Sequence, residues 1–159
     1  MSWTTADLYD AHEDKVQVGE PLLRDYGGSA RFCGETFTLR VFEDNSLVRR
    51  ALEQPGRGRV LVVDGGGSLR CALLGDLLGL LAVDNGWAGV IVNGCVRDSR
   101  ALASLTLGVK ALAANPRKSV KQGQGEEGSE VRFAALTFRP GQWVYCDQDG
   151  ILLSPVRLH

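Results

Sequence analysis

The chain has 159 residues, of which 44% are hydrophobic, and a net charge of −1 at neutral pH. This length suits a single domain, residues 1–159, that buries about two thirds of the surface of its unfolded chain. The near-neutral charge offers no basic patch for direct nucleic-acid binding. The sequence has no uninterrupted apolar stretch of about 18 residues and no signal-peptide pattern at its start, so we expect a cytoplasmic protein without membrane association.

The first third of the sequence predicts two helices on either side of a strand. A short helix is predicted over residues 4–9, with a threonine as its cap. Residues 32–42 alternate between apolar and polar, which predicts a strand. Asp44 and Asn45 are then expected to cap a helix over residues 46–52.

A β-α-β crossover follows, and it is the most informative part of the sequence. Two continuous apolar runs, residues 60–63 and 89–92, predict strands that are buried on both faces. Between them, a helix is predicted to begin at Asp76 and to end near Gly86. Four leucines recur at helical spacing around this helix: Leu74, Leu77, Leu78 and Leu81.

The crossover is expected to bring three segments to one edge of the sheet. Because its two strands must run parallel, the loop after Val63, the helix start at Gly75 and the turn over residues 94–98 meet outside the carboxyl ends of the strands. Open α/β folds bind their ligands at this edge. The sequence therefore predicts a ligand site there.

Charged and polar groups at the ends of these elements form the candidate site. The backbone N–H groups at the helix start, from Asp76, Leu77 and Leu78, can receive a carboxylate or a phosphate. A bound anion would also face Arg97. Each charged residue has a simpler alternative: Asp76 as an acidic residue favoured by the helix dipole, Asp98 as the cap of the next helix, and Arg97 as its ion-pair partner.

The second half of the sequence is predicted to be rich in strands. A helix over residues 100–105 precedes a strand over residues 109–113, and the polar run 118–130 is expected to be an exposed loop. Three further strands are predicted over residues 131–136, 143–146 and 151–154. Turns are predicted at Pro140–Gly141 and Asp149–Gly150. This order predicts a mixed α/β domain with a β-α-β core.

Other patterns in the sequence do not favour a second catalytic, cofactor or metal site. The four cysteines include no C-x-x-C pair and the chain has two histidines, so we expect reduced, mostly buried thiols and no zinc site. Residues 65–70 give G-x-G-x-x-R, where arginine replaces the third small residue of a dinucleotide-binding motif. Lys110 is a candidate Schiff-base lysine, although an outward lysine on an alternating strand is the simpler interpretation.

The charged triplet carries a resemblance to a known family. The spacing D-x20-R-D, formed by Asp76, Arg97 and Asp98 behind a Gly-Asp helix start, resembles the class II 4-hydroxy-4-methyl-2-oxoglutarate aldolases. The segments EPLLRDYGG, EQPGRGRVLVVDGGGSLR and DQDGILLSP make the whole chain similar to their relatives, the regulators of ribonuclease activity A. The resemblance implies a layered β/β/α, swivelling-domain-like fold and a homotrimer with a metal-dependent site between subunits.

The resemblance and the residue types together imply a reaction. Asp98 is expected to hold Mg²⁺ or Mn²⁺, with Asp76 in support through a water molecule. The N–H groups over residues 75–78 would receive a substrate carboxylate, and Arg97 would face the 2-keto oxygen. The expected reaction is retro-aldol cleavage of a 4-hydroxy-2-oxo acid to pyruvate. Oxaloacetate decarboxylation is expected at the same site, because it passes through the same enolate.

A non-enzymatic alternative comes from the same resemblance. The regulators act as protein inhibitors of a ribonuclease, and the family pattern implies that they lose the acidic residues at the positions of Asp76 and Asp98. The presence of both here favours the enzyme. The aldolases add an acidic residue from a neighbouring subunit on a carboxyl-terminal extension that this sequence does not include. Glu43 or Asp44 is a candidate substitute, although Asp44 is more simply a helix cap.

Overall fold

The computed structural model describes residues 2–159 and confirms a mixed α/β fold. The helices are α1 (Thr5–His12), α2 (Ser46–Leu52), α3 (Asp76–Asp84) and α4 (Ser99–Leu102). The strands of the first half are β1 (Gln17–Val18), β2 (Arg24–Asp25), β3 (Phe32–Arg40), β4 (Val60–Asp64), β5 (Ala72–Leu74) and β6 (Gly89–Val96). The strands of the second half are β7 (Gly108–Ala114), β8 (Glu126–Glu127), β9 (Val131–Phe133), β10 (Leu136–Phe138), β11 (Trp143–Asp147) and β12 (Gly150–Ser154).

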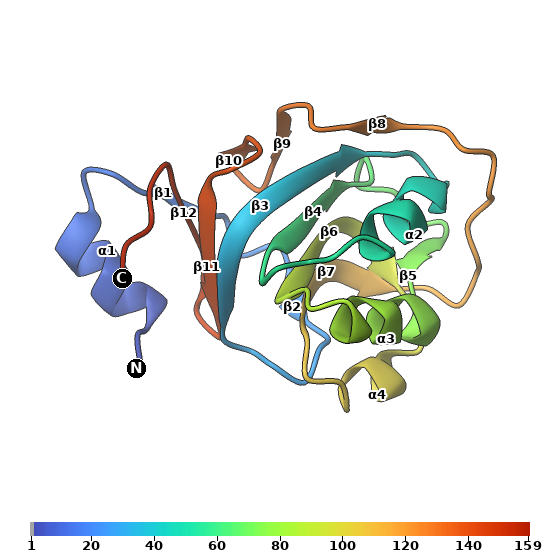
Figure 1. Cartoon of the computed structure of the whole chain (residues 1–159), viewed down its shortest axis with the longest axis horizontal. Coiled ribbons are helices and arrows are strands. Elements are labelled where there is room, and N and C mark those ends of the chain that lie inside the picture. Colours follow the sequence, from blue (N-terminus) through green and yellow to red (C-terminus); the bar gives the residue numbers. More distant parts are fainter. Residues whose placement is uncertain (1) are drawn as a thin grey trace.

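A single long strand, β3, joins the two parts of the main sheet. Its first half pairs antiparallel with β11, and its second half pairs parallel with β4. Across the described residues the strand order is β1-β12-β11-β3-β4-β6-β7-β2. The sheet curls along this order, so that β11 and β12 lie at one end and the parallel strands β4, β6 and β7 lie beneath the helices (Figure 1).

Alternation along β4 separates two hydrophobic cores. Leu61 and Val63 pack in the core on the helical side, while Val60 and Val62 pack against residues of β9 to β12 on the other side. Figure 1 shows α2, α3 and α4 on one face of the parallel strands. The layers are therefore the helices, the parallel strands, and the antiparallel strands of the same curled sheet together with the β9–β10 hairpin, in line with the β/β/α layering that the resemblance implies.

Local sequence signals explain where the first two helices begin. The Thr4 side chain accepts a hydrogen bond from the N–H of Asp7, which caps α1. Asp44, and not Asn45, caps α2, because its Oδ1 accepts from the backbone N–H of Ser46 at 2.9 Å. The predicted caps are thus confirmed for Thr4 and Asp44.

The crossover is confirmed, but two of its boundaries differ from the prediction. Leu74 belongs to the short strand β5, which pairs with β6, and not to the helix. The predicted turn over residues 94–98 begins later, because β6 continues to Val96 with both Cys95 and Val96 buried. Leu77, predicted on the apolar helix face, is 71% exposed, and the buried face of α3 carries Leu78, Gly79 and Ala82 instead.

Further differences lie in the second half. The single strand predicted over residues 131–136 is a hairpin, with Ala134 and Ala135 at φ of 52° and 61° in its turn. Alanine carries no turn signal, so the pattern of the sequence hides this reversal. The predicted helix over residues 100–105 ends at Leu102. Within the predicted exposed loop 118–130, Ser119 is buried.

Lys110 is buried, which makes the prediction of an outward lysine wrong. Its Nζ lies 3.0 Å from Asp25 Oδ1 and donates to the carbonyl oxygen of Asp147 at 2.8 Å. This ion pair links β2, β7 and the end of β11. A charged amine tolerates burial when a carboxylate and a carbonyl partner it in this way.

The four cysteines are free, and three of them, Cys71, Cys95 and Cys146, are buried. Burial raises the pKa of each of these thiols. These features confirm the expected unbridged, mostly buried thiols. None of the helices within residues 2–159 is long and apolar enough to cross a membrane.

Candidate functional site

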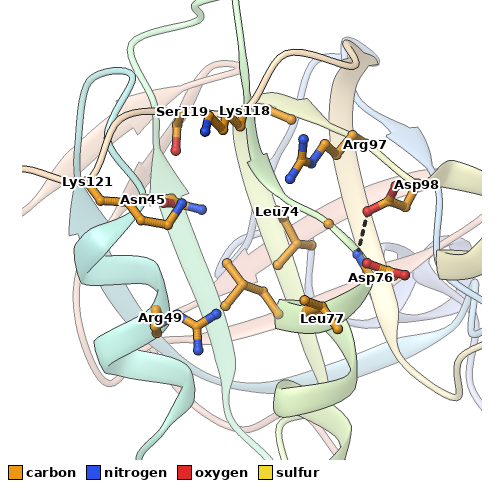
Figure 2. A pocket seen from close by; sticks show the side chains of 13 residues that line it. Asn45, Arg49, Leu74, Asp76, Leu77, Arg97, Asp98, Lys118, Ser119 and Lys121 are labelled. Atoms are coloured by element: carbon orange, nitrogen blue, oxygen red, sulfur yellow. Dashed lines mark hydrogen bonds between the residues drawn. The ribbon is translucent and has the colours of Figure 1, made fainter.

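A cavity of about 190 Å³ lies at the predicted edge of the sheet. Its walls come from four segments: the start of α2, the junction of β5 with α3, the residues after β6, and the segment 118–121. Figure 2 shows Asp76, Arg97 and Asp98 together on one wall, with Asn45 and Arg49 on the opposite wall. The structure therefore brings together the residues that the sequence placed at element ends.

Asp98 is directed at the start of α3. Its Oδ2 accepts a hydrogen bond from the backbone N–H of Asp76 at 3.1 Å. Its backbone has a φ of 56° and a ψ of 42°, a left-handed conformation that aspartate adopts more readily than most residues with a side chain. Asp98 precedes α4 but makes no side-chain cap there, so the alternative of a cap for the next helix is wrong.

Gly75 makes this approach sterically possible. A Cβ atom at this position would lie 2.7 Å from Asp98 Oδ2 and 3.3 Å from Cγ of Arg97. Contacts below 3.0 Å require one of the groups to move. The two residues of the Gly-Asp pair at the helix start thus act together. Gly75 leaves room for the Asp98 carboxylate, and the backbone N–H of Asp76 donates a hydrogen bond to it.

The free donors at the helix start are fewer than the sequence predicts. The N–H of Asp76 is taken by Asp98, and the N–H of Gly79 donates to the carbonyl oxygen of Gly75 at 2.9 Å. Within residues 2–159, the N–H groups of Leu77 and Leu78 have no acceptor. These two groups lie at the positive end of the helix dipole, where free N–H groups can bind an anion.

Arg97 stays available for a ligand. Its Nη1 donates to the carbonyl oxygen of Pro116 at 3.3 Å, and among the described residues it forms no ion pair. The alternative of an ion pair with Asp98 is therefore wrong. A guanidinium held by one carbonyl group keeps most of its donors free for an oxyanion.

Sequence reasoning missed five polar residues of this cavity: Asn45, Arg49, Lys118, Ser119 and Lys121. With Arg97, they give the cavity four cationic side chains against two carboxylates. The segment 118–121 reaches the site through backbone bridges from Lys118 to Ala72 and from Val120 to Asp44. The basic run in NPRKSVK was a signal, but its loop composition concealed these long-range contacts.

The donor set of the cavity fits a hard divalent cation. Asp76 and Asp98 supply carboxylate oxygens, and the described lining residues include no histidine or cysteine. No group of three potential ligand side chains occurs within residues 2–159. Mg²⁺ is commonly held by one or two carboxylates together with water and substrate oxygens, so two carboxylates on an open cavity are sufficient.

Neither candidate for a further acidic residue at the site, Glu43 or Asp44, is free. Oε2 of Glu43 pairs with Arg70 at 2.7 Å and accepts from the Ser68 hydroxyl. Asp44 is fully engaged by backbone N–H groups and by Ser46. The acidic groups of the cavity within this chain are thus Asp76 and Asp98.

The fold and the cavity define an α/β protein with a mixed-charge cavity at the carboxyl edge of its parallel strands. The chain belongs to the Aldolase/RraA family, whose RraA-like model matches residues 5–153. A protein of Aromatoleum aromaticum named "Putative 4-hydroxy-4-methyl-2-oxoglutarate aldolase" is 57% identical over 154 residues, which cover 97% of each chain. A protein of the same name from Laribacter hongkongensis is 59% identical over 155 residues, 98% of each chain.

Solved structures share the fold over nearly the whole chain. The RNA-processing inhibitor RraA from Thermus thermophilis superposes with a TM-score of 0.94 at 47% identity, covering 98% of this chain and 94% of that one. A protein of Geobacillus kaustophilus described as an S-adenosylmethionine: 2-dimethylmenaquinone methyltransferase gives 0.96 at 46% identity, covering 98% and 97%. These two structures share the fold but are named for different functions. The function of this chain therefore has to be argued from its site.

Proposed function

We propose that the protein is a divalent-metal-dependent aldolase that cleaves 4-hydroxy-4-methyl-2-oxoglutarate, or a related 4-hydroxy-2-oxo acid, to pyruvate. The observation that carries this proposal is the meeting of Asp76, Arg97 and Asp98 around the free N–H groups of a helix start. The name of the closely similar relatives supports a carbon–carbon lyase. The metal, the substrate and the decarboxylase side activity belong to the proposal.

The cavity offers a separate position for each polar group of such a substrate. The N–H groups of Leu77 and Leu78 suit the carboxylate beside the keto group. Arg97 suits the 2-keto oxygen, on which negative charge develops. A second carboxylate, at the far end of the substrate, is suited to the cationic wall formed by Arg49 and Lys121.

The proposed cleavage requires charge stabilisation at one end of the breaking bond and proton removal at the other. The C3–C4 bond breaks, its electron pair forms the pyruvate enolate, and the 4-hydroxyl oxygen becomes a carbonyl oxygen as its proton leaves. Arg97 stabilises the enolate oxygen. A water molecule held by Asp76 is the candidate base for the hydroxyl proton. Asp98 would hold Mg²⁺ or Mn²⁺, which supplies further positive charge beside the keto oxygen.

The proposal extends to the assembly and to its cellular setting. In the single chain the Asp76 and Asp98 side chains are exposed, so a neighbouring subunit of a homotrimer would be needed to enclose them. We place this trimer in the cytoplasm, in line with the four free thiols. No direct contact with nucleic acid or membrane is part of the proposal.

The alternative function is inhibition of a ribonuclease by direct protein binding. The name of the Thermus thermophilis structure supports this alternative. The two carboxylates at the cavity favour the enzyme, because they supply the oxygen ligands that a divalent cation needs beside the free N–H groups and Arg97. No feature of the cavity favours a methyltransferase over either candidate.

A pyruvate-release assay tests the proposal. The purified protein is given 4-hydroxy-4-methyl-2-oxoglutarate or oxaloacetate, and pyruvate is measured with magnesium, with a chelator, and with magnesium restored. Both activities should disappear with the chelator and return together, because both need the same enolate. Borohydride with substrate should trap no adduct, because Lys110 is bound to Asp25 outside the cavity. The two lysines that line the cavity, Lys118 and Lys121, are exposed and lack the desolvated setting that a Schiff-base lysine needs.

The opposite outcomes are equally specific. Chelator-resistant cleavage, or a borohydride adduct on Lys110 or on another lysine, would overturn the metal mechanism. Failure to cleave either substrate with any divalent metal, together with tight binding to a ribonuclease, would establish the regulator in its place.

A further inference from the structure

A second cavity, of about 350 Å³, lies at the other edge of the parallel strands. Its wall includes Arg59, directly before β4, and Trp87, two residues before β6, so it lies at the amino ends of these strands. It shares no residue with the cavity at Asp76 and Asp98. Its volume falls in the range of about 300–1,000 Å³ that is typical of small-molecule sites.

The loop between α2 and β4 forms part of this wall, and its hydrogen-bond acceptors are already used. The carbonyl oxygen of Gln54 accepts from Nε1 of Trp87 at 3.1 Å. The carbonyl oxygens of Pro55 and Gly56 accept from Arg59, from its Nη2 at 3.1 Å and from its Nε at 3.0 Å. These hydrogen bonds fix the loop and leave the cavity with more donors than acceptors.

Arg59 carries a positive charge that no carboxylate balances. Among residues 2–159 it forms no ion pair, and its Nη1 makes no hydrogen bond. Its guanidinium carbon lies 4.8 Å from the ring centre of Trp87 and 5.4 Å from that of Phe37, and the residue is half-buried. Aromatic faces attract a cation but do not neutralise it, so N–H donors of Arg59 remain for an anion.

Arg57 adds a second free guanidinium group to the same wall. Within the part of the chain that the structure describes, it forms neither an ion pair nor a side-chain hydrogen bond. The third arginine of the cavity, Arg50, is paired with Glu127 through its Nε at 3.1 Å. Three arginines against one glutamate leave the cavity with two positive charges in excess.

We infer that the second cavity binds a small phosphate monoester, with Arg57 and Arg59 on the phosphate group. Guanidinium forks match the oxygen geometry of a phosphate. A phosphate monoester carries a charge of about −1.5 to −2 at pH 7, which matches the excess of two, whereas a single carboxylate would balance half of it. The cavity is larger than a phosphate ion, and Phe37 and Pro55 also line it, so the ligand needs an organic group to fill it. The inference goes beyond the proposed aldolase reaction and does not depend on it.

Isothermal titration calorimetry of the whole protein with AMP, ribose 5-phosphate, adenosine and sodium sulfate tests this inference. At least one of the two phosphate monoesters should bind. Adenosine and sulfate should each bind at least about tenfold more weakly, because adenosine lacks the charged group and sulfate lacks the organic group. Binding of AMP alone would identify a nucleotide site, and binding of ribose 5-phosphate as well would identify a sugar-phosphate site.

Three variants locate the bound ligand. Arg57→Asn removes one guanidinium without straining the backbone, because asparagine tolerates the left-handed φ of 56° at this position. It should raise the dissociation constant of the phosphate monoester at least about tenfold. Arg100→Gln, which removes the same charge from an exposed residue of α4, should leave this constant unchanged. Lys121→Gln, in the cavity at Asp76 and Asp98, should leave it unchanged as well.

Three results would overturn the inference. Equal affinities for sulfate and for the monoesters would show an adventitious ion only. Weaker binding in Lys121→Gln, with unchanged binding in Arg57→Asn, would place the ligand in the cavity at Asp76 and Asp98. No binding of either monoester by the folded wild-type protein would show that the two free arginines are only a solvated surface.

Discussion

Gly75 affects the geometry of the site because it has no side chain. Gly75→Ala would place a Cβ atom 2.7 Å from Asp98 Oδ2 and displace that carboxylate from the N–H of Asp76. We expect kcat/KM for pyruvate release to fall at least about tenfold, because the carboxylate is displaced. Stability should change little, because the nearest atom is the end of an exposed side chain that can move. Steady-state kinetics and urea unfolding measure the two effects.

A substitution at a second glycine separates the effect on activity from the effect on stability. Gly141 lies in the turn before β11 at a φ of 83°, with open space around the position of a Cβ atom. Gly141→Ala should therefore destabilise the protein by about 1 kcal/mol through backbone strain while leaving kcat/KM unchanged. Full activity in Gly75→Ala would show that the position of Asp98 is unimportant.

Substitutions of Arg97 and Asp98 are expected to change different kinetic quantities. Arg97→Lys replaces a planar fork with a point charge and should lower kcat about 100-fold, the usual cost of losing a donor to a developing oxyanion. Asp98→Asn removes a metal ligand and should raise the magnesium concentration for half-maximal activity at least about tenfold.

Magnesium titrations of both variants measure this difference, with Arg100→Lys, at an exposed residue of α4, as the control. Wild-type kcat and magnesium dependence in both variants would contradict the roles given to Arg97 and Asp98.

At the scale of elements, Asp44 connects the start of α2 with the segment 122–124. Its Oδ1 accepts from the N–H and the hydroxyl of Ser46, and its Oδ2 accepts from the N–H groups of Gln122 and Gln124 at 2.8 and 3.2 Å. Burial raises the pKa of the Asp44 carboxyl, but these hydrogen bonds outweigh burial and lower the pKa below the usual 3.8.

Asp44→Asn should destabilise the protein by about 1–3 kcal/mol at pH 7, because it sets an amide donor against backbone donors. A carboxyl whose pKa is lowered by folding stabilises the protein above its unfolded pKa, and this contribution is lost as the pH falls below 3.8 toward the folded value. The difference in the free energy of unfolding between the wild type and Asp44→Asn should therefore become smaller below pH 3.8. Urea unfolding from pH 7 to pH 3 measures it, with exposed Asp10→Asn as the control. A difference that is constant with pH would contradict the assignment.

Elements with local signals could be predicted from the sequence, and elements made by distant pairing could not. The crossover β4-α3-β6 follows from two apolar runs and a Gly-Asp helix start, which are local features. The strand β5 has three residues and exists because it pairs with β6. The same reason explains which residues of the site could be predicted. Asp76, Arg97 and Asp98 lie at the ends of elements that have local signals. Ser119 lies at the cavity because its two neighbours in the chain form backbone bridges with residues more than 40 positions away.

Two exposed leucines on α3 are relevant at the scale of the whole molecule. Leu77 is 71% exposed and Leu80 is 47% exposed, one helical turn apart on the same face, while the opposite face of α3 is buried. Leu77 also lines the cavity, so this apolar surface is continuous with the exposed carboxylates of the site. A second copy of the chain on this surface would both bury the leucines and exclude water from the cavity.

We predict a homotrimer in solution, and multi-angle light scattering should give about three times the chain mass of 17.2 kDa. Leu80→Lys should lower both the mass and the activity, since it places a charge on the proposed contact without entering the cavity. Leu22→Lys, at a residue that is 53% exposed and remote in sequence from α3, should change neither. A monomer with full activity would show that one chain encloses the reaction alone, and the two exposed carboxylates would then have to act in open solvent.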